Sequence, residues 1–591
     1  KMFSKRRKGK IVNKQELDVL KSLSSKTYIN QRVLSEISGH SLGVVNRSIK
    51  NLIKNGYVDE QMRLTKLAKK EFIVLSPKNA IILAAGFGMR MVPINTQYPK
   101  ALIEVDGEPL IERIIKQLNC VGINDIYIVV GYMKEQFEYL IDEYKVKLIV
   151  NEKYAEKNNL HSLRLVADYL SNTYIIPCDI WCDKNPFHRN ELYSWYMVSD
   201  LVTDESNVRV NRKAELVKNN AGGNQMVGIT YLVEEDSRII KKRLIEFDNQ
   251  KKYDNSFWEE TLYSGEKMIV QANVVHSDEV VEINTYEQLR ELDDESAHLN
   301  SDAISIIANA LKVNEKEITD IQVLKKGMTN RSFSFVCRNK KYIMRIPGEG
   351  TDQLINREHE AKVYHTLEGK GICDDPIYIN SKNGYKITKY LDGVRTCDCM
   401  NQNDLIVCMK KLKEFHDMDL KVDHTFNIFG QIQYYEELWE GTPSIYRDYK
   451  KTKDNVLSLK SYIDEHKNRW CLTHIDAVPD NFLFYDGGMQ LTDWEYSGMQ
   501  DPHVDIAMFC IYSLYDRRQI DNLIDIYFEG KCGRDTRIKI YCYIAVCGLL
   551  WSNWCEYKRK LGVEFGEYSL CQYRYAKEYY KIVKEELFHE S

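Results

Sequence analysis

Two signatures, far apart along the chain, constrain this 591-residue sequence more than any other feature. Residues 83–90 read Leu-Ala-Ala-Gly-Phe-Gly-Met-Arg, and Pro99 and Lys100 follow. Residues 474–481 read His-Ile-Asp-Ala-Val-Pro-Asp-Asn, and Asp493 follows after an apolar stretch. A glycine loop beside basic residues can cradle phosphates on main-chain N–H groups, and an Asp–Asn pair with a further Asp can serve phosphoryl transfer. The chain is therefore predicted to hold two separate active sites.

The length of the chain exceeds what one hydrophobic core organises, so several domains are expected. Local patterns favour three, at residues 1–75, 77–298 and 301–591. Hydrophobic residues make up 44% and charged residues 28% of the chain, which is typical of globular proteins. No run of 18 apolar residues occurs, and the first residues lack the apolar stretch of a signal peptide. We expect a cytoplasmic protein without membrane insertion.

The first 75 residues form a distinct basic module, with 17 Lys and Arg against 6 Asp and Glu. Helical periodicity at 16–23, 31–37 and 42–54, followed by a short ribbon, predicts a winged helix-turn-helix. Ser41 is predicted to cap the third helix, which would expose Asn46, Arg47 and Lys50 to a DNA groove. Contact with DNA is one interpretation. The other is that the module only dimerises the protein or docks on the other domains.

Residues 77–298 alternate apolar strands with helices. Strands are expected at 80–84, 126–130 and 146–150, and helices at 110–118 and 134–144. This alternation predicts a Rossmann-like α/β domain with a parallel sheet covered on both faces. The loop at 86–90 then opens from the first strand, where a triphosphate can approach the main chain. Arg90 and Lys100 are predicted to neutralise its charge.

Residues 301–591 begin with a helix at 302–311 and strands at 333–336 and 342–346, and become mainly helical from about 402. A small β-rich lobe before a helical lobe predicts a bilobal, protein-kinase-like α+β fold. Asp476 is predicted to accept the proton of a substrate hydroxyl, and Asn481 and Asp493 to bind Mg²⁺. Asp505 is expected to brace the loop that carries Asp476.

Residues 78–292 resemble the bacterial CTP:phosphocholine cytidylyltransferases. The resemblance rests on the glycine loop and on Pro-Lys-Ala-Leu at 99–102, Gly-Ile-Asn-Asp-Ile at 122–126 and Asn-Glu-Lys-Tyr-Ala at 151–155. It implies a metal site at Asp179 with Glu282 and Asn284, although the family commonly has Asp where this chain has Asn284. It also implies that Trp258 stacks on a trimethylammonium group. The nucleotide-binding residues implied are Leu83, Ala84, Ala85, Gly86, Gly88, Asn159 and Ser162.

Residues 300–591 resemble bacterial choline kinases and, more distantly, aminoglycoside phosphotransferases. The resemblance implies that Thr329 and Asn330 cover the nucleotide phosphates, and that Arg345 replaces the usual strand lysine and pairs with Glu360. An aromatic wall for a quaternary ammonium is implied at Trp551, Trp554 and Tyr568. The alternative is that these tryptophans only fill the core.

Together the two resemblances imply a bifunctional enzyme. ATP would phosphorylate choline, and CTP would convert phosphocholine to CDP-choline, with Mg²⁺ at both sites and phosphocholine decoration of surface glycans downstream. One alternative keeps both reactions but uses ethanolamine or aminoethylphosphonate. Another is a DNA-binding regulator that uses the two domains as ligand sensors. Whether the chain forms a homo-oligomer is left open by the sequence.

Overall fold

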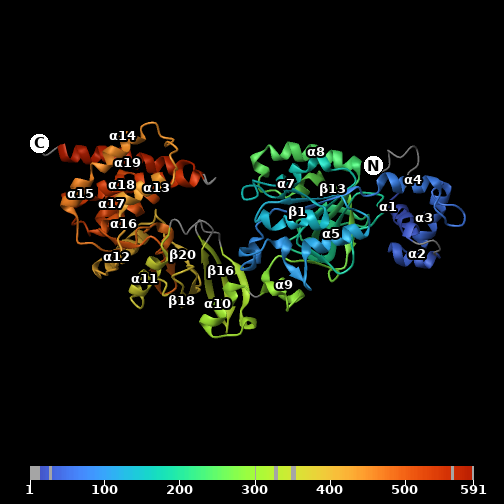
Figure 1. Ribbon diagram of the computed structural model, residues 1–591, viewed down its shortest axis with the longest axis horizontal. Coiled ribbons are helices and arrows are strands. Elements are labelled where there is room, and N and C mark those ends of the chain that lie inside the picture. Colours follow the sequence, from blue (N-terminus) through green and yellow to red (C-terminus); the bar gives the residue numbers. More distant parts are fainter. Residues whose placement is uncertain are drawn as a thin grey trace. The chain divides into compact units, whose positions relative to one another are not determined.

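The computed structural model describes residues 13–25, 30–299, 301–324, 330–347, 355–560 and 565–588. The chain divides into two compact units, Lys1–Ile304 and Ser305–Ser591 (Figure 1). The first unit contains a small helical domain and a large mixed sheet, and the second contains a β-rich lobe followed by helices. The predicted fold class is confirmed in all three parts.

The N-terminal domain is a winged helix. Its helices are α1 Lys14–Ser25, α2 Gln31–Ser38, α3 Leu42–Lys54 and α4 Lys66–Leu75, and a bridge between Val58 and Leu64 forms the wing. Apolar side chains recur at helical spacing on these helices, and Val19, Leu34 and Leu52 are completely buried between them. Ser41 occupies the predicted N-cap position of α3, and its side chain makes no capping hydrogen bond.

The central sheet of the first unit runs in the order β5-β4-β1-β6-β11-β8-β13-β10-β9, with β12 beside β13. Its first half is parallel, as the alternating pattern predicts, because β1 pairs in parallel with both β4 and β6. Its second half is mixed, since β11 runs antiparallel to β6 and β8, whereas β13 is parallel to β8. The strands are β1 Asn79–Ala84, β4 Ile126–Val130, β5 Lys147–Val150, β6 Thr173–Pro177, β8 Trp195–Thr203, β9 Val208–Val210, β10 Glu215–Lys218, β11 Gly223–Leu232, β12 Tyr263–Ser264 and β13 Lys267–Val275.

Helices cover both faces of this sheet. One core joins α5 Leu110–Cys120 and α6 Tyr139–Tyr144 to the sheet, and the other joins α7 Asn159–Leu165 and α8 Glu234–Asp248. The segment expected to be one helix at 134–144 is a short 3₁₀ turn at Lys134–Phe137 followed by α6. Two small ribbons, β2 Glu104–Val105 with β3 Glu108–Pro109 and β7 Ile180–Cys182 with β14 Val280–Glu282, lie outside the main sheet. Helix α9 Tyr286–Leu292 follows β14.

The second unit begins with α10 Asp302–Leu311, most of which belongs to it, and a five-stranded antiparallel sheet in the order β15-β16-β17-β19-β18. Its strands are β15 Thr319–Val323, β16 Asn330–Cys337, β17 Lys340–Pro347, β18 Tyr378–Ile379 and β19 Lys386–Lys389. Helix α11 Arg357–Leu367 buries Val363 and Leu367, which belong to the core of the helical lobe.

The remainder of the unit is helical, with short ribbons that carry the catalytic loop. The ribbons are β20 Arg395–Thr396, β21 Cys471–Thr473, β22 Phe482–Tyr485, β23 Gly488–Leu491 and β24 Gly498–Gln500. The helices are α12 Gln402–Asp417, α13 Ile428–Glu437, α14 Tyr449–Leu457, α15 Lys460–His466, α16 His503–Tyr512, α17 Arg517–Tyr527, α18 Arg534–Lys560 and α19 Glu567–Phe588. Helix α18 is long and apolar enough to cross a membrane, but 94% of its apolar window is buried within the fold, as in the core helix of a folded domain.

Candidate active sites

In the first unit, the glycine loop leaves the carboxyl end of β1 and lies directly against Lys100. Leu83, Ala84 and Ala85 are buried, which fixes the start of the loop. Gly88 has a φ of +58°, and a Cβ atom there would lie 3.0 Å from the Cβ of Lys100. Glycine is therefore needed at position 88 both for its left-handed backbone and for the close approach to Lys100.

Four predicted side chains converge beyond this loop. The Nζ of Lys100 donates to Asp179 and, at 2.7 Å, to Oδ1 of Asn284. Arg90 donates to the same oxygen at 2.8 Å. The contact is possible because β14 pairs with β7, which follows Asp179, and the N–H of Ile283 donates to the carbonyl of Asp179 at 3.0 Å. Residues separated by almost 200 positions thus form one mixed-charge cluster.

This cluster has the donor atoms of a magnesium–nucleotide site. Asp179 contributes a buried Oδ1 without a hydrogen-bond partner, and carboxylate oxygens are the ligands that Mg²⁺ prefers. Burial and the neighbouring Asp179 raise the pKa of Glu282, so a cation between the two carboxylates would relieve their repulsion. The oxygen of Asn284 already accepts from Lys100 and Arg90 in this conformation.

Trp258 and Ser162 are buried in the domain, and Asn159 is half-buried beside them. Trp258 is 2% exposed and packs with Tyr196 in the core. The backbone N–H of Trp258 donates to the side-chain oxygen of Asn159 at 2.8 Å, and the buried hydroxyl of Ser162 accepts from the amide of Asn151 at 3.0 Å. The family resemblance implies head-group stacking for Trp258, whereas the structure buries its indole in the core, so this expectation is corrected to a packing role. Asn159 and Ser162 lie on α7 and tie this helix to Trp258 and Asn151.

Sequence reasoning missed the neighbour of this tryptophan. The carboxylate of Glu259 accepts from the hydroxyl of Tyr196 at 3.2 Å, and its other oxygen is buried without a partner. Burial raises the pKa of Glu259 to about 7, and Glu282 contributes to the rise. The only sequence signal was an acidic residue directly after the tryptophan, which by itself does not distinguish a buried carboxylate from a solvated one.

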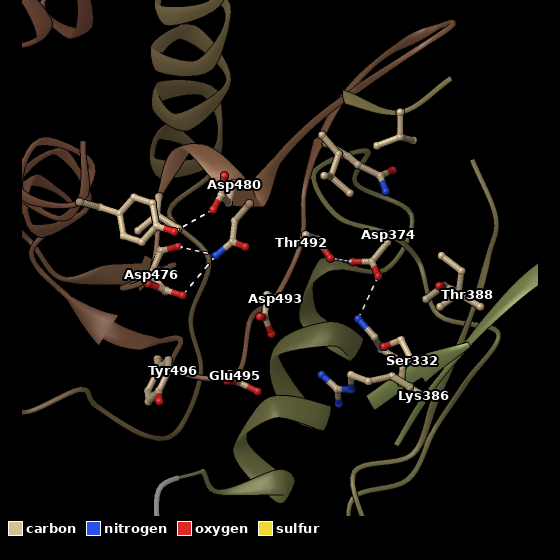
Figure 2. A pocket seen from close by; sticks show the side chains of 18 of the residues that line it. Ser332, Asp374, Lys386, Thr388, Asp476, Asp480, Thr492, Asp493, Glu495 and Tyr496 are labelled. Atoms are coloured by element: carbon tan, nitrogen blue, oxygen red, sulfur yellow. Dashed lines mark hydrogen bonds and ion pairs between the residues drawn. The ribbon is translucent and has the colours of Figure 1, made fainter. Parts of the chain in front are cut away.

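The second unit contains a cavity of about 900 Å³ between its two lobes (Figure 2). Predicted residues from five separate segments line it: Arg345, Asp476, Asn481, Asp493, Trp551, Trp554 and Tyr568. Glu360 lies behind the wall and holds Arg345. Thr329 is outside the described residues, and of Asn330 only the backbone, in β16, is described.

The loop between β21 and β22 presents Asp476 to the cavity. The amide of Asn481 donates to the carbonyl of Asp476 at 2.9 Å and to its carboxylate at 3.2 Å. Beneath the loop, the buried carboxylate of Asp505 accepts from the N–H groups of His474 at 2.9 Å and Ile475 at 2.7 Å. Ile475 has a φ of +69°, a left-handed conformation that β-branched residues rarely adopt. The loop is therefore held in a strained shape by Asp505.

A group of carboxylates gathers at the floor of the cavity, where Asp476, Asp493 and Glu495 are close together (Figure 2). Burial and then the neighbouring Asp493 raise the pKa of Asp476 to about 7 and that of Glu495 to about 8. Burial also raises the pKa of Asp493. Clustered, desolvated carboxylates are stabilised by a divalent cation, so the donor set fits Mg²⁺.

Cationic side chains face these carboxylates from the small lobe. Arg345 on β17 donates to Glu360 on α11 at 2.5 Å and to the carbonyl of Gly384 at 2.9 Å. Burial alone would raise the pKa of Glu360, but Arg345 holds it below its ordinary value. Lys386 on β19, which sequence reasoning missed, lines the same wall and donates to Asp374 at 2.9 Å (Figure 2). In the sequence it reads as an ordinary strand residue.

Aromatic side chains from the helical lobe form part of the cavity wall. Trp551 and Trp554 on α18 meet edge to face with ring centroids 5.4 Å apart, and Tyr568 follows on α19. Tyr496, Tyr512 and Phe565, which were not predicted, complete the wall. An enclosure of π faces suits a cation that lacks hydrogen-bond donors. Trp551 and Trp554 line the cavity and also pack with the core of the helical lobe.

Three family models match the chain. They describe a winged helix-turn-helix DNA-binding domain at residues 12–59, a MobA-like NTP transferase domain at 80–189 and a choline/ethanolamine kinase at 321–526. These matches agree with the three folds described above.

Individual relatives match different parts of the chain. The choline-phosphate cytidylyltransferase of Haemophilus influenzae is 32% identical over 35% of this chain and 92% of that protein. The 2-aminoethylphosphonate cytidylyltransferase of Lancefieldella rimae is 30% identical over 36% of this chain and 92% of that protein. Protein LicA of Haemophilus influenzae is 27% identical over 41% of this chain and 95% of that protein.

Proposed function

The chain belongs to the choline-phosphate cytidylyltransferase family, and from this premise we propose that it makes CDP-choline in two steps. The same polypeptide carries a choline/ethanolamine kinase domain and a winged helix. The kinase domain transfers a phosphoryl group from ATP to choline. The cytidylyltransferase domain then joins phosphocholine to CTP and releases pyrophosphate. The observation that carries the proposal is that aromatic side chains and Asp476 line the same kinase cavity, so that a site for a cation and a candidate general base share one space.

In the kinase step, Asp476 orients the choline hydroxyl and accepts its proton, while the trimethylammonium group lies against Trp551 and Trp554. Arg345 and Lys386, on strands of the small lobe, neutralise the phosphates of ATP. Asn481 and Asp493 would hold Mg²⁺, which supplies charge neutralisation at the transferred phosphoryl group. The proposal for these roles rests on the distances within the cavity and on the clustered carboxylates.

In the cytidylyl step, the N–H groups of the loop at Gly86 and Gly88 bind the triphosphate of CTP. Lys100 and Arg90 stabilise the charge that develops at the α-phosphate and on the leaving pyrophosphate. Asp179 and Glu282 would hold Mg²⁺, with Asn284 orienting Lys100 and Arg90. The phosphate of phosphocholine is the nucleophile, so charge neutralisation supplies most of the catalysis.

One experiment tests both sites in one chain. Asp476→Ala should abolish phosphocholine formation from choline and ATP, yet leave CDP-choline formation from supplied phosphocholine unchanged. Lys100→Ala should do the reverse. Products are followed by mass spectrometry in Mg²⁺ buffer, and loss of both activities in either folded variant would contradict two independent sites. Within this proposal the reactions are cytoplasmic, and CDP-choline supplies phosphocholine to surface glycans.

The acceptor of the cytidylyl step has a second candidate. A relative named for 2-aminoethylphosphonate matches the same segment at almost the same identity as the choline-phosphate relative. The unpartnered oxygen of Glu259 can accept a hydrogen bond from a primary ammonium group, whereas a trimethylammonium group has no N–H to donate. Parallel reactions with phosphocholine, phosphoethanolamine and aminoethylphosphonate distinguish the acceptors by their kcat/KM.

A second function, DNA binding, is favoured by the free face of α3. Arg47, Lys50 and Lys54 are exposed on this helix, which contains no acidic residue. Within the described part of the chain none of the three forms an ion pair. Arg47→Glu with Lys50→Glu should remove salt-sensitive binding of duplex DNA in a mobility-shift assay, with both enzymatic activities kept. DNA binding that persists unchanged would exclude α3 as the contact.

A further inference from the structure

A chain of three polar side chains connects the winged helix to the strand that leads to Asp179. Lys21 on α1 donates to both oxygens of Glu191, at 2.8 and 2.9 Å. Glu191 is only 1% exposed, although it belongs to the loop before β8. The contact joins residues 170 positions apart. The winged helix thus supplies the counter-charge of a carboxylate buried in the neighbouring domain.

The same carboxylate holds strand β6. The hydroxyl of Tyr174 donates to Glu191 at 2.9 Å, and Tyr174 is completely buried. Tyr174 pairs with Ala80 of β1 and with Tyr231 of β11, so it lies at the centre of the sheet. Strand β6 ends at Pro177, two residues before Asp179. A shift of Tyr174 along the strand is therefore transmitted to the carboxylate of the cytidylyltransferase site.

The surrounding contacts show that the two domains share one packed interface. Leu192 is buried in the hydrophobic core of the winged helix, and the hydroxyl of Tyr193 donates to Asp18 on α1 at 2.5 Å. Burial alone would raise the pKa of Glu191, but Lys21 and then His188 hold it below its ordinary value. His188 is half exposed and lies 3.3 Å from Glu191, so Lys21 is the closer cation.

We infer that Lys21, Glu191 and Tyr174 position strand β6 and Asp179, which makes helix α1 of the winged helix a supporting part of the cytidylyltransferase site. An ion pair at this depth is compensated only while both partners are present. Without Lys21, Glu191 retains only His188 and is drawn towards solvent. The hydroxyl of Tyr174 then keeps only the longer contact to the carbonyl of His188, at 3.3 Å, and Asp179 loses part of the support that fixes its position. The kinetic part of this inference rests on the proposed cytidylyl transfer.

The test compares Lys21→Met with Lys69→Met, which removes an exposed lysine of α4 outside this interface. Because displacing a catalytic group by about 1 Å slows a reaction by roughly 100-fold, a partial shift should lower kcat for cytidylyl transfer by about 10-fold in Lys21→Met. Amide hydrogen exchange of residues 173–179, measured with a metal chelator in the buffer, should accelerate in the same variant. Lys69→Met and the conservative Lys21→Arg should match the parent in both measurements, and phosphorylation of choline should be unchanged throughout.

Two results would overturn the inference: unchanged exchange at residues 173–179 in Lys21→Met, or an equal loss of both enzymatic activities. The exchange measurement needs neither substrate nor metal. If the parent chain fails to form CDP-choline, the proposed function fails, whereas faster exchange at β6 would still support the link to α1.

Discussion

Asp505 is the residue for which the structure gives the sharpest quantitative prediction. Its carboxylate accepts from two successive N–H groups, those of His474 and Ile475, and from Nε2 of His416 at 2.8 Å. The substitution Asp505→Asn keeps the size of the side chain but leaves one carbonyl oxygen. The new NH₂ group would face a backbone donor, so one of the two loop contacts is lost.

The magnitude follows from that contact. A hydrogen bond to a charged group contributes about 1.5–3 kcal/mol. Ile475 is held at positive φ, which costs on the order of 1–3 kcal/mol and favours relaxation once the contact is broken. If the lost hydrogen bond raises the activation free energy by its full contribution, phosphorylation of choline should slow by about 10- to 150-fold, because about 1.4 kcal/mol corresponds to a factor of ten in rate.

The assay measures kcat for phosphocholine formation at saturating choline and ATP. Formation of CDP-choline from supplied phosphocholine, in the same sample, should be unchanged and reports that the chain is intact. Asp516→Asn is the matched control, because Asp516 also accepts a backbone N–H at an exposed helix cap, where asparagine caps equally well. A kcat within threefold of the parent for folded Asp505→Asn would refute the bracing role.

Three further predictions concern the same unit. Trp554→Leu should raise KM for choline by about 2- to 30-fold, as expected from loss of a cation–π contact, with less effect on KM for ATP in steady-state assays. Lys539→Met, which removes the ammonium group paired with the completely buried Asp501, should lower the free energy of unfolding by about 3–5 kcal/mol in urea titrations. Lys577→Met, which removes a half-exposed ion pair, should change it by less than about 1 kcal/mol. Burial lowers the pKa of His503 to about 3, below the unfolded value of about 6.5, so the folded state binds fewer protons than the unfolded state between these pH values. The free energy of unfolding should therefore fall by up to about 1.4 kcal/mol per pH unit as the pH is lowered through this range. The substitution His503→Gln should flatten that slope.

The sequence by itself determined the three folds and the loops that carry the chemistry. The loop from Gly86 to Arg90 and the loop from His474 to Asn481 are contiguous, and each follows an apolar strand whose end it occupies. Local spacing is enough to predict such features, since glycine, proline and aspartate act on the backbone within a few residues. Strands β1 and β4 and helix α3 follow from the same local periodicity.

Only the tertiary structure decided which distant side chains meet. The antiparallel half of the sheet, the burial of Trp258, the position of Lys386 on the cavity wall and the contact between Lys21 and Glu191 all depend on how strands pair across long stretches of chain. A lysine in a strand reads the same whether it faces water or a cavity, and a carboxylate shows no sign in the sequence of the cation that neutralises it. Desolvation and pairing are properties of the folded surroundings, so the support of Asp179 by the winged helix could be recognised only in three dimensions.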